Sequence, residues 1–309
     1  MALGAYPTPV ERLHDLAGVR GELWIKRDDL NAPAFGGNKV RALEFLLGAV
    51  RAGDTVLTVG GEGSTHVLTT AAHARRLGLA TDAVRWPHDM SPTAHAVAER
   101  AAELCARIVT SRGAVRGLAR AATLRLTASR DTPSLYIPLG GSTPLGILGH
   151  VNAALELAEQ VARGEMPVPT RVVVPLGSGG TAAGLALGFR IAGLGTTVVG
   201  ARVGPRVGAN GWRALRLARA TAALIARHTG EEVTAPDGRH LLVVHDVYGG
   251  AYGRSTPGGE EAAEVLRRAR GIRLDATYSA KAFAAARTLA RVPGSRILFW
   301  LTFDGRWMG

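Results

Sequence analysis

A lysine follows a glycine-rich turn in the segment Gly36-Gly37-Asn38-Lys39. The paired glycines allow the backbone to turn tightly and a ligand to approach it closely. The residues after the turn have helical periodicity, so this lysine is predicted to lie near a helix N-terminus, where the positive end of the helix dipole disfavours a charged amine and lowers its pKa. An amine that is held neutral is a nucleophile toward aldehydes. The motif alone fits equally well a surface lysine that follows a loop.

A second glycine-rich segment, Gly177-Ser178-Gly179-Gly180-Thr181, lies between an apolar strand-like run and a helical run. Consecutive N–H groups in such a turn, backed by a helix N-terminus, form a phosphate cradle to which the two hydroxyls add donors. The spacing Gly177-x-Gly179-x-x-Ala182 also satisfies the looser dinucleotide pattern. That pattern needs an acidic residue about 20 positions further on to bind a ribose. The next predicted strand ends with only Arg202 there, which disfavours NAD and leaves NADP as an alternative.

A third turn of this kind spans residues 60–66, which read Gly-Gly-Glu-Gly-Ser-Thr-His. It also lies between a predicted strand and a predicted helix, so its N–H groups are suited to binding a substrate carboxylate. A helix cap provided by Ser64 or Thr65 explains the same residues without any ligand.

Strand-like runs alternate with helical runs along the whole chain, which is typical of parallel α/β sheets. The predicted strands span residues 23–26, 54–59, 80–86, 135–138, 171–175, 197–203, 241–245 and 296–302. The predicted helices span residues 40–52, 69–77, 94–108, 116–128, 145–161, 181–191, 212–228, 260–270 and 280–289. In such sheets the glycine-rich turns follow the strands, where ligands bind.

The formal net charge of +12 invites a nucleic-acid interpretation, but the chain holds only three lysines and its arginines are scattered along predicted helices, as solvated faces would be. No nucleic-acid partner and no metal site are predicted. Cys105 is the only cysteine, so no intrachain disulfide can form. No segment approaches the roughly 20 apolar residues that span a bilayer, and the N-terminus has no signal-peptide pattern. We expect a cytoplasmic protein that does not bind membranes.

Several segments, in order over nearly the whole chain, resemble the D-cysteine desulfhydrase / 1-aminocyclopropane-1-carboxylate deaminase family. The matching segments are Tyr6-Pro7-Thr8-Pro9 and residues 23–30, 35–41, 142–146, 177–181, 252–253 and 274–279. The resemblance implies the tryptophan-synthase-β-like fold (fold type II) that binds pyridoxal 5′-phosphate, with two open, mostly parallel α/β lobes. Residues 1–40 and 145–309 would form the larger, cofactor-binding lobe, and residues 41–144 the smaller one. It further implies a small amino-acid substrate and a homodimer.

The resemblance also implies roles for individual residues. Lys39, one of three lysines in the chain, would be the Schiff-base lysine and move protons at the substrate carbon. Ser64, Thr65 and His66 would contact the substrate, with Thr65 also near the cofactor ring. The remaining implied contacts are Tyr252 and Tyr278 (substrate and proton handling), Asn38, Gly177, Ser178, Gly179, Gly180 and Thr181 (cofactor and phosphate), and Thr302 (pyridine nitrogen).

Two features favour the desulfhydrase branch of this family, since His66 follows Ser64-Thr65 and Ser279 follows Tyr278. Three segments depart from the family pattern: Gly63-Ser64-Thr65-His66 for Gln-Ser-Asn-His, Leu301-Thr302-Phe303-Asp304 for His-Thr-Gly-Gly, and Tyr278-Ser279-Ala280-Lys281 for Tyr-x-Gly-Lys. We expect these changes, Leu301, Phe303 and Asp304 among them, to alter the substrate pocket.

The favoured function is therefore a pyridoxal-phosphate lyase or deaminase with D-cysteine desulfhydrase-like β-elimination. One alternative is a diverged biosynthetic enzyme of the same cofactor that acts on a substituted amino acid. Another is a catalytically silent protein that binds the cofactor. The joint presence of Lys39, Ser64, Tyr252 and Tyr278 argues against the silent protein.

Overall fold

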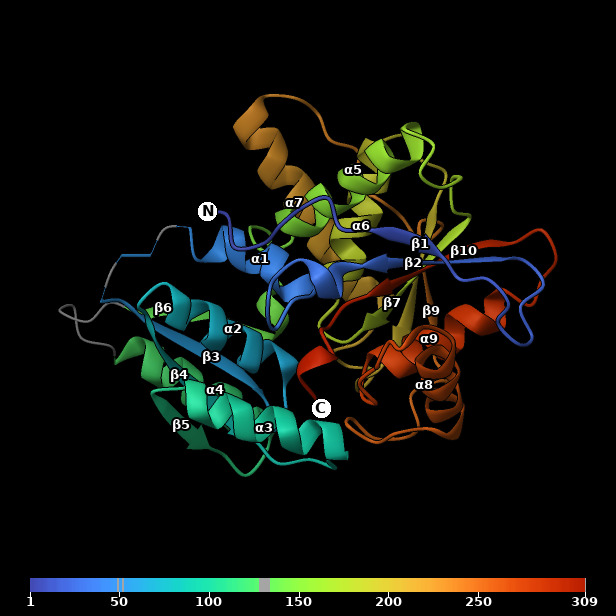
Figure 1. The fold of residues 1–309 in the computed structure, drawn as a ribbon. Coiled ribbons are helices and arrows are strands. Elements are labelled where there is room, and N and C mark those ends of the chain that lie inside the picture. Colours follow the sequence, from blue (N-terminus) through green and yellow to red (C-terminus); the bar gives the residue numbers. More distant parts are fainter. Residues whose placement is uncertain (49, 52, 128–133, 309) are drawn as a thin grey trace.

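The computed structural model describes residues 1–48, 50–51, 53–127 and 134–308, which form two α/β units, each built on its own sheet (Figure 1). Residues 52 and 128, where two of the predicted helices were expected to end, lie outside the described residues. Within the described part, none of the helices has the length and apolarity needed to cross a membrane.

The larger sheet has six strands, and its N-terminal edge strand is antiparallel whereas the other neighbours are parallel. Its order is β1 (Val10–Arg12), β2 (Glu22–Arg27), β10 (Arg296–Leu301), β7 (Arg171–Leu176), β8 (Thr197–Arg202) and β9 (Leu241–Val244). Strands from both ends of the chain therefore pair side by side at its centre, because β10 lies between β2 and β7.

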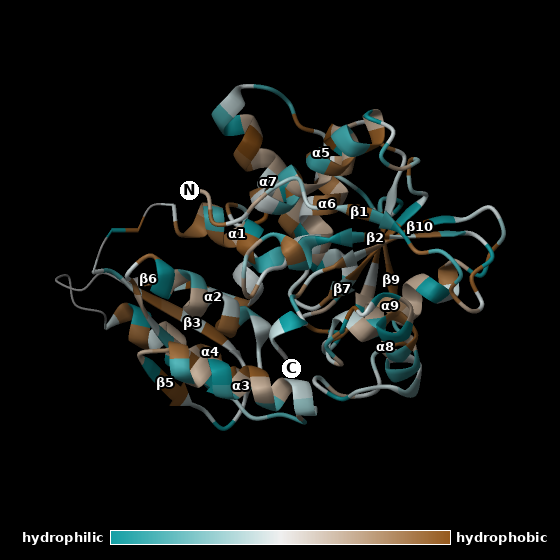
Figure 2. Ribbon diagram, in the orientation of Figure 1, coloured by the Kyte–Doolittle hydropathy of each residue, from teal (hydrophilic) through white to brown (hydrophobic). Residues whose placement is uncertain are grey.

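Helices cover both faces of this sheet. The covering helices are α5 (Leu148–Ala162), α6 (Gly180–Ile191) and α7 (Gly211–Thr229) on one face, and α8 (Pro257–Arg270) and α9 (Ser279–Leu289) on the other. Successive strand residues point to opposite faces, so Val172 and Val174 join the core under the first group while Val173 joins the core under the second. In Figure 2 the covering helices carry both hydrophilic and hydrophobic residues, and β1 and β2 of this sheet are partly hydrophilic.

The smaller sheet has four parallel strands, β5 (Arg107–Thr110), β4 (Ala80–Trp86), β3 (Thr55–Gly61) and β6 (Ser134–Ile137), in that order. Residues of α1 (Asn38–Leu46), α2 (Thr65–Arg76) and α3 (Pro92–Leu104) share cores with this sheet, and α4 (Ala114–Leu126) packs on it in a separate core. Short 3-10 helices span Asp28–Leu30, Leu139–Gly141 and Arg306–Met308.

The predicted fold class, with parallel α/β sheets, is confirmed, but two edge strands were missed. The predicted helix at residues 94–108 is too long, because α3 ends at Leu104 and β5 begins at Arg107. β5 pairs only with β4 and none of its residues is buried, so it lacks the apolar pattern that identifies a strand. β1 has three residues and is equally weakly marked.

Candidate active site

The candidate site lies where the carboxyl ends of the central strands of the larger sheet meet the start of α1. β7 runs into the turn at residues 177–181, and β10 is followed directly by Thr302. The Thr302 carbonyl accepts a hydrogen bond from the Asn38 N–H at 3.1 Å, and Gly37 forms a β-bridge with Phe303. Ligands of parallel α/β sheets bind at this edge. The fold therefore brings together the turn at residues 36–39, which precedes α1, and the turn at residues 177–181, called the phosphate turn below because of its predicted role.

Lys39 occupies the first turn of α1 with its side chain half-buried. Burial lowers the pKa of its amine to about 8, in the direction expected from loss of hydration around a charged group. Among the described residues it has no hydrogen-bond or ion-pair partner. Its charge is felt by two buried imidazoles, His66 and His150, whose pKa values burial and this lysine both lower. The amine is therefore available for chemistry.

The other two lysines are committed elsewhere. The Lys26 amine is fully buried and donates to the Thr8 carbonyl at 2.7 Å, to Glu156 at 2.5 Å and to the Gln160 side chain. The Lys281 amine donates to the Tyr248 carbonyl at 2.8 Å. Of the three lysines, Lys39 is the one whose amine no described residue holds.

A buried ionic cluster fixes α1 from behind. Arg41, two residues after Lys39, donates to Asp28 at 2.7 and 2.9 Å and to Glu156 at 2.8 Å, and its guanidinium lies 4.3 Å from the Tyr6 ring centroid. Burial raises the pKa of Asp28, but Arg41 outweighs it and the net pKa is lowered. Such a network fixes the direction of the helix and with it the position of the lysine.

The turn at residues 177–181 has the geometry of an anion cradle. Gly179 precedes α6 with φ +89°, a conformation that side chains disfavour. The first N–H groups of α6 have no intrahelical acceptor. Two side-chain contacts brace the turn, because Asn38 Nδ2 donates to Thr181 Oγ1 at 2.6 Å and Ser142 Oγ donates to Ser178 Oγ at 2.7 Å.

Ser142 is a site residue that the sequence reasoning missed. A Cβ on Gly180 would lie 2.5 Å from the Ser142 hydroxyl, so the two segments are in close contact. The available signal was its place in Ser142-Thr143-Pro144-Leu145-Gly146, which matched the family but received no role.

The turn at residues 60–66, called the carboxylate turn below because of its predicted role, presents free hydroxyls at the start of α2. Ser64 is the N-cap residue, yet its side chain makes no capping hydrogen bond. Ser64 and Thr65 are both buried, and neither hydroxyl has a hydrogen-bond partner among the described residues. Hydroxyls and N–H groups at a helix N-terminus suit a carboxylate.

His66 points into the small lobe. Its Nε2 lies 3.0 Å from Thr58 Oγ1, and because that hydroxyl donates to the Ile137 carbonyl at 3.0 Å, it accepts from the imidazole. Burial first, and Lys39 second, lower the pKa of His66 to about 3. A neutral imidazole bonded to Thr58 supports the turn at residues 60–66 from behind, and the predicted contact of His66 with the substrate stays a prediction.

Tyr252 and Tyr278 form a pair whose hydroxyls are hydrogen-bonded to each other, with ring centroids 6.0 Å apart. A Cβ on Gly61 would lie 3.0 Å from Tyr252 Cε1, and a Cβ on Gly177 would lie 4.0 Å from Tyr278 Cε1. The pair therefore spans the space between the carboxylate turn and the phosphate turn. Burial raises the pKa of Tyr252 to about 12 and that of Tyr278 well above 10, so both phenols keep their protons at neutral pH.

The segment at the end of β10 is held by contacts within the protein. Leu301 lies in the core under α8 and α9, Phe303 packs edge-on against Trp307 with centroids 6.2 Å apart, and the Asp304 carboxylate accepts from Arg306 at 2.8 Å. Each of these side chains thus has a partner within the protein, and their predicted effect on the substrate pocket stays a prediction. Thr302 is buried, and its hydroxyl has no partner among the described residues.

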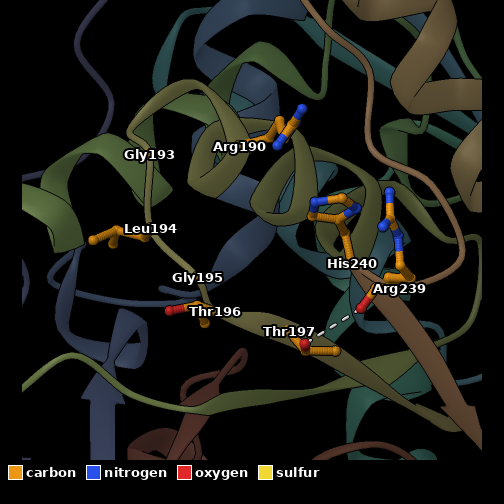
Figure 3. Close-up of a pocket in the computed structure, with 8 residues that line it drawn as sticks. All are labelled: Arg190, Gly193, Leu194, Gly195, Thr196, Thr197, Arg239 and His240. Carbon is orange, nitrogen blue, oxygen red and sulfur yellow. Dashed lines mark hydrogen bonds between the residues drawn. The ribbon is translucent and has the colours of Figure 1, made fainter.

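A separate hollow of about 380 Å³ lies at the opposite edge of the larger sheet, where β8 and β9 begin (Figure 3). Arg190, Arg239 and His240 line it, and Thr197 Oγ1 donates to the Arg239 carbonyl at 3.3 Å. Ligands of parallel sheets bind at the carboxyl edge, so this hollow is not part of the candidate site.

Comparisons with known proteins agree with the site. Residues 1–302 match the family model described as "Pyridoxal-phosphate dependent enzyme". The chain is 38% identical to the nocardicin C-9′ epimerase of Nocardia uniformis subsp. tsuyamanensis, over 99% of this chain and 95% of the epimerase. It is 35% identical to the D-cysteine desulfhydrase of Salmonella choleraesuis (strain SC-B67), over 90% of this chain and 84% of that enzyme.

Among solved structures, the chain is similar to an ACC deaminase homologue with a TM-score of 0.83 and 28% identity, covering 98% of this chain and 91% of that one. The processed form of threonine deaminase isoform 2 from Solanum lycopersicum, at 16% identity and a TM-score of 0.65, shares the fold over 98% of this chain and 80% of that one.

Proposed function

Because the chain belongs to the pyridoxal-phosphate dependent enzymes, we propose that it is a lyase that eliminates the β-substituent of a small amino acid such as D-cysteine. The predicted cofactor and the fold-type-II class are confirmed by the family match and by the structural neighbours. The observation that carries the proposal is Lys39, whose amine has no partner among the described residues and whose neighbour Asn38 contacts Thr181 in the turn at residues 177–181.

The described residues fit the cofactor. The turn at residues 177–181, with Gly179 in a left-handed conformation and free N–H groups, would hold the phosphate. The unpartnered Thr302 hydroxyl would meet the pyridine nitrogen, and Asn38 and Thr65 would flank the ring. Pyridoxal phosphate supplies an aldehyde that bonds to amines and a ring that withdraws electrons from the α-carbon of a bound amino acid.

The proposed roles on the substrate side follow from the chain's own groups. Ser64 and Thr65 would bind the carboxylate with the N–H groups at the start of α2. Lys39, with a pKa of about 8, is partly neutral near neutral pH and would take the proton from the α-carbon. Tyr278, whose hydroxyl keeps its proton at neutral pH, would hydrogen-bond to the departing thiolate, and Tyr252 would orient it.

The nature of Thr302 favours elimination over transamination. A neutral hydroxyl does not stabilise a positive charge on a ring nitrogen as a carboxylate would. Less electron density is then drawn away from the substrate, which suits a reaction in which the leaving group takes the electron pair.

A second candidate is a biosynthetic enzyme of the same family that inverts or modifies a substituted amino acid. The observation that favours it is the 38% identity to an epimerase over 99% of the chain. Lys39 and Tyr278 are two separate proton carriers, and an epimerase needs one group to remove the α-proton and another to return it.

One experiment separates the two candidates. The purified enzyme is incubated in D₂O with D-cysteine, D-serine, aminocyclopropane carboxylate and bulkier β-substituted amino acids. Elimination converts D-cysteine and water to pyruvate, ammonia and sulfide, which are measured directly. Deuterium at the α-carbon of recovered substrate of both configurations, without pyruvate, would replace the lyase by the epimerase.

We also propose the division into a larger lobe of residues 1–40 and 145–309 and a smaller lobe of residues 41–144, which the two separate sheets support. A homodimer is proposed from the family resemblance, and its test is the mass of the holoenzyme by light scattering.

A further inference from the structure

A second cavity, of about 490 Å³, lies on the small lobe beside the loop that leads into Lys39. Its walls come from this loop, from the end of α2 and from the end of α3. The lining residues that matter are Phe35, Ala72, His73, Arg76 and Leu104. The volume falls within the roughly 300–1,000 Å³ typical of small-molecule sites.

His73 is the unexplained group in this cavity. The residue is 1% exposed, and neither ring nitrogen makes a hydrogen bond to a described residue. Burial and the nearby Arg76 lower its pKa to about 4, and a contact with the Phe35 backbone, whose geometry falls short of a hydrogen bond, offsets part of this shift. A buried polar group without a partner is costly, and replacing it by an apolar group of the same shape is often neutral or stabilising. The ring nitrogens are closed off from solvent in this structure, so a ligand in the cavity would reach them after a shift of the side chains around His73.

The charges at the rim select the kind of ligand. Arg76 is exposed and forms no ion pair with a described residue, and Arg75 uses one guanidinium nitrogen on the Glu103 carbonyl at 3.3 Å. The Glu103 carboxylate is paired with Arg100. The floor and walls formed by Phe35, Ala72 and Leu104 are apolar.

We propose that this cavity binds a small carboxylic acid with an aromatic or branched apolar body. The body would lie against Phe35 and Leu104, the His73 imidazole would hydrogen-bond to the ligand, and Arg76 would pair with its carboxylate. The assignment rests on the cavity, on the unpartnered imidazole and on charge complementarity, and it is independent of the reaction at Lys39.

The cavity is placed to act on the catalytic loop. Phe35 has φ +54°, which is unusual for a non-glycine residue, and its ring packs against Trp307 with centroids 5.4 Å apart. Four residues later the chain reaches Lys39. On α2, Thr65, Thr69 and His73 share one face by their spacing of four, and the Thr69 hydroxyl is also buried without a partner among the described residues. A ligand that contacts Phe35 and His73 would therefore restrain both segments that lead to the active site.

The test is a calorimetric titration of the holoenzyme with 3-phenylpropionate, alongside its neutral amide and alongside propionate. We expect the acid to bind, and the amide and propionate to bind at least ~10-fold more weakly, because one loses the charge and the other the apolar body. Arg76→Gln and His73→Phe should each weaken binding ~10-fold. Titration of 3-phenylpropionate should also shift the His73 imidazole signals in the NMR spectrum.

Two matched variants locate the binding. Arg190→Gln, at the end of a helix beside the hollow of Figure 3, should leave the affinity unchanged, and so should Ser64→Ala in the candidate active site. Equal affinity for acid and amide, or binding that Arg76→Gln and His73→Phe leave intact, would overturn the proposal. Absence of 3-phenylpropionate binding would also overturn the proposal. If the mass of the holoenzyme then falls on Arg76→Gln substitution, the cavity is assigned to a contact with a second copy of the chain.

Discussion

The phosphate turn makes a quantitative prediction through Gly179, which combines φ +89° with burial at the start of α6. Valine in the left-handed conformation costs about 1–2 kcal/mol. A Cβ there would lie 3.4 Å from the Ala214 Cβ, which is ordinary van der Waals contact, so the expected cost comes from the backbone conformation. Loss of one N–H hydrogen bond to a phosphate is worth about 1.5–3 kcal/mol, which corresponds to about 10- to 150-fold in affinity. Gly179→Val should therefore raise the Kd for pyridoxal phosphate by at least ~10-fold.

Gly164 provides the matched control, because it has φ +76° and no heavy atom within 4 Å of a Cβ built on it. Gly164→Val carries the same backbone strain but lies outside the site. Urea denaturation of the two apoproteins should show similar losses of stability, while fluorescence titration with the cofactor should show weakened binding only in Gly179→Val. A folded Gly179→Val protein that retains wild-type affinity, or an equal loss in Gly164→Val, would refute the reasoning.

Three further predictions follow from the lysines and from Asp304. Borohydride reduction of the holoenzyme and peptide mapping should place the pyridoxyl adduct on Lys39; an adduct on Lys26 or Lys281 would refute the assignment. In the apoprotein, burial lowers the pKa of Lys39 from 10.5 to about 8. Between these pH values the unfolded chain binds more protons than the folded chain, so the unfolding free energy rises with pH. This rise should be smaller in Lys39→Met, as measured by urea denaturation from about pH 7 to about pH 10. Asp304→Asn, which weakens the pairing with Arg306, should lower the urea midpoint but leave the relative rates on D-cysteine and D-serine unchanged, and a changed preference in the amino-acid panel would place this residue in the substrate pocket.

The alternation of apolar strands and helices was sufficient to predict the parallel sheets, because buried strands such as β7 carry continuous apolar runs. Edge strands lack that pattern. The first residues of β5 were assigned to the preceding predicted helix, because none of the β5 residues is buried and the strand therefore lacks an apolar pattern. The start of α1 at Asn38 instead of residue 40 places Lys39 within the first turn of the helix, a detail set by the bridge between Gly37 and Phe303, which lie far apart in the sequence.

The site turns were marked by glycine spacing, but the contacts that join them were not. Pairs such as Asn38 with Thr181 and Ser142 with Ser178 are long-range and leave no local signal. Asp304 belongs to a segment that was expected to alter the substrate pocket, and the structure pairs its carboxylate with Arg306, a contact that the sequence did not indicate. A polar residue beside a site motif can either contact the ligand or pair with a residue of a neighbouring loop. Only the three-dimensional arrangement distinguishes these two possibilities.

The choice between elimination and epimerisation depends on the tyrosine pair more than on the fold. In the mechanism proposed above, both reactions begin when Lys39 removes the α-proton, and they diverge according to which atom next receives a proton. Tyr252 and Tyr278 share a hydrogen bond, and burial raises both pKa values above the normal 10. Both phenols therefore carry a proton at neutral pH, which in the proposed mechanism would be drawn from the pair against this raised pKa. If that proton reaches the β-substituent, the thiolate leaves; if it reaches the α-carbon from the side opposite to Lys39, the configuration inverts. Tyr278→Phe should therefore abolish the reaction that the enzyme performs but leave α-proton exchange with solvent in place, because exchange needs only Lys39.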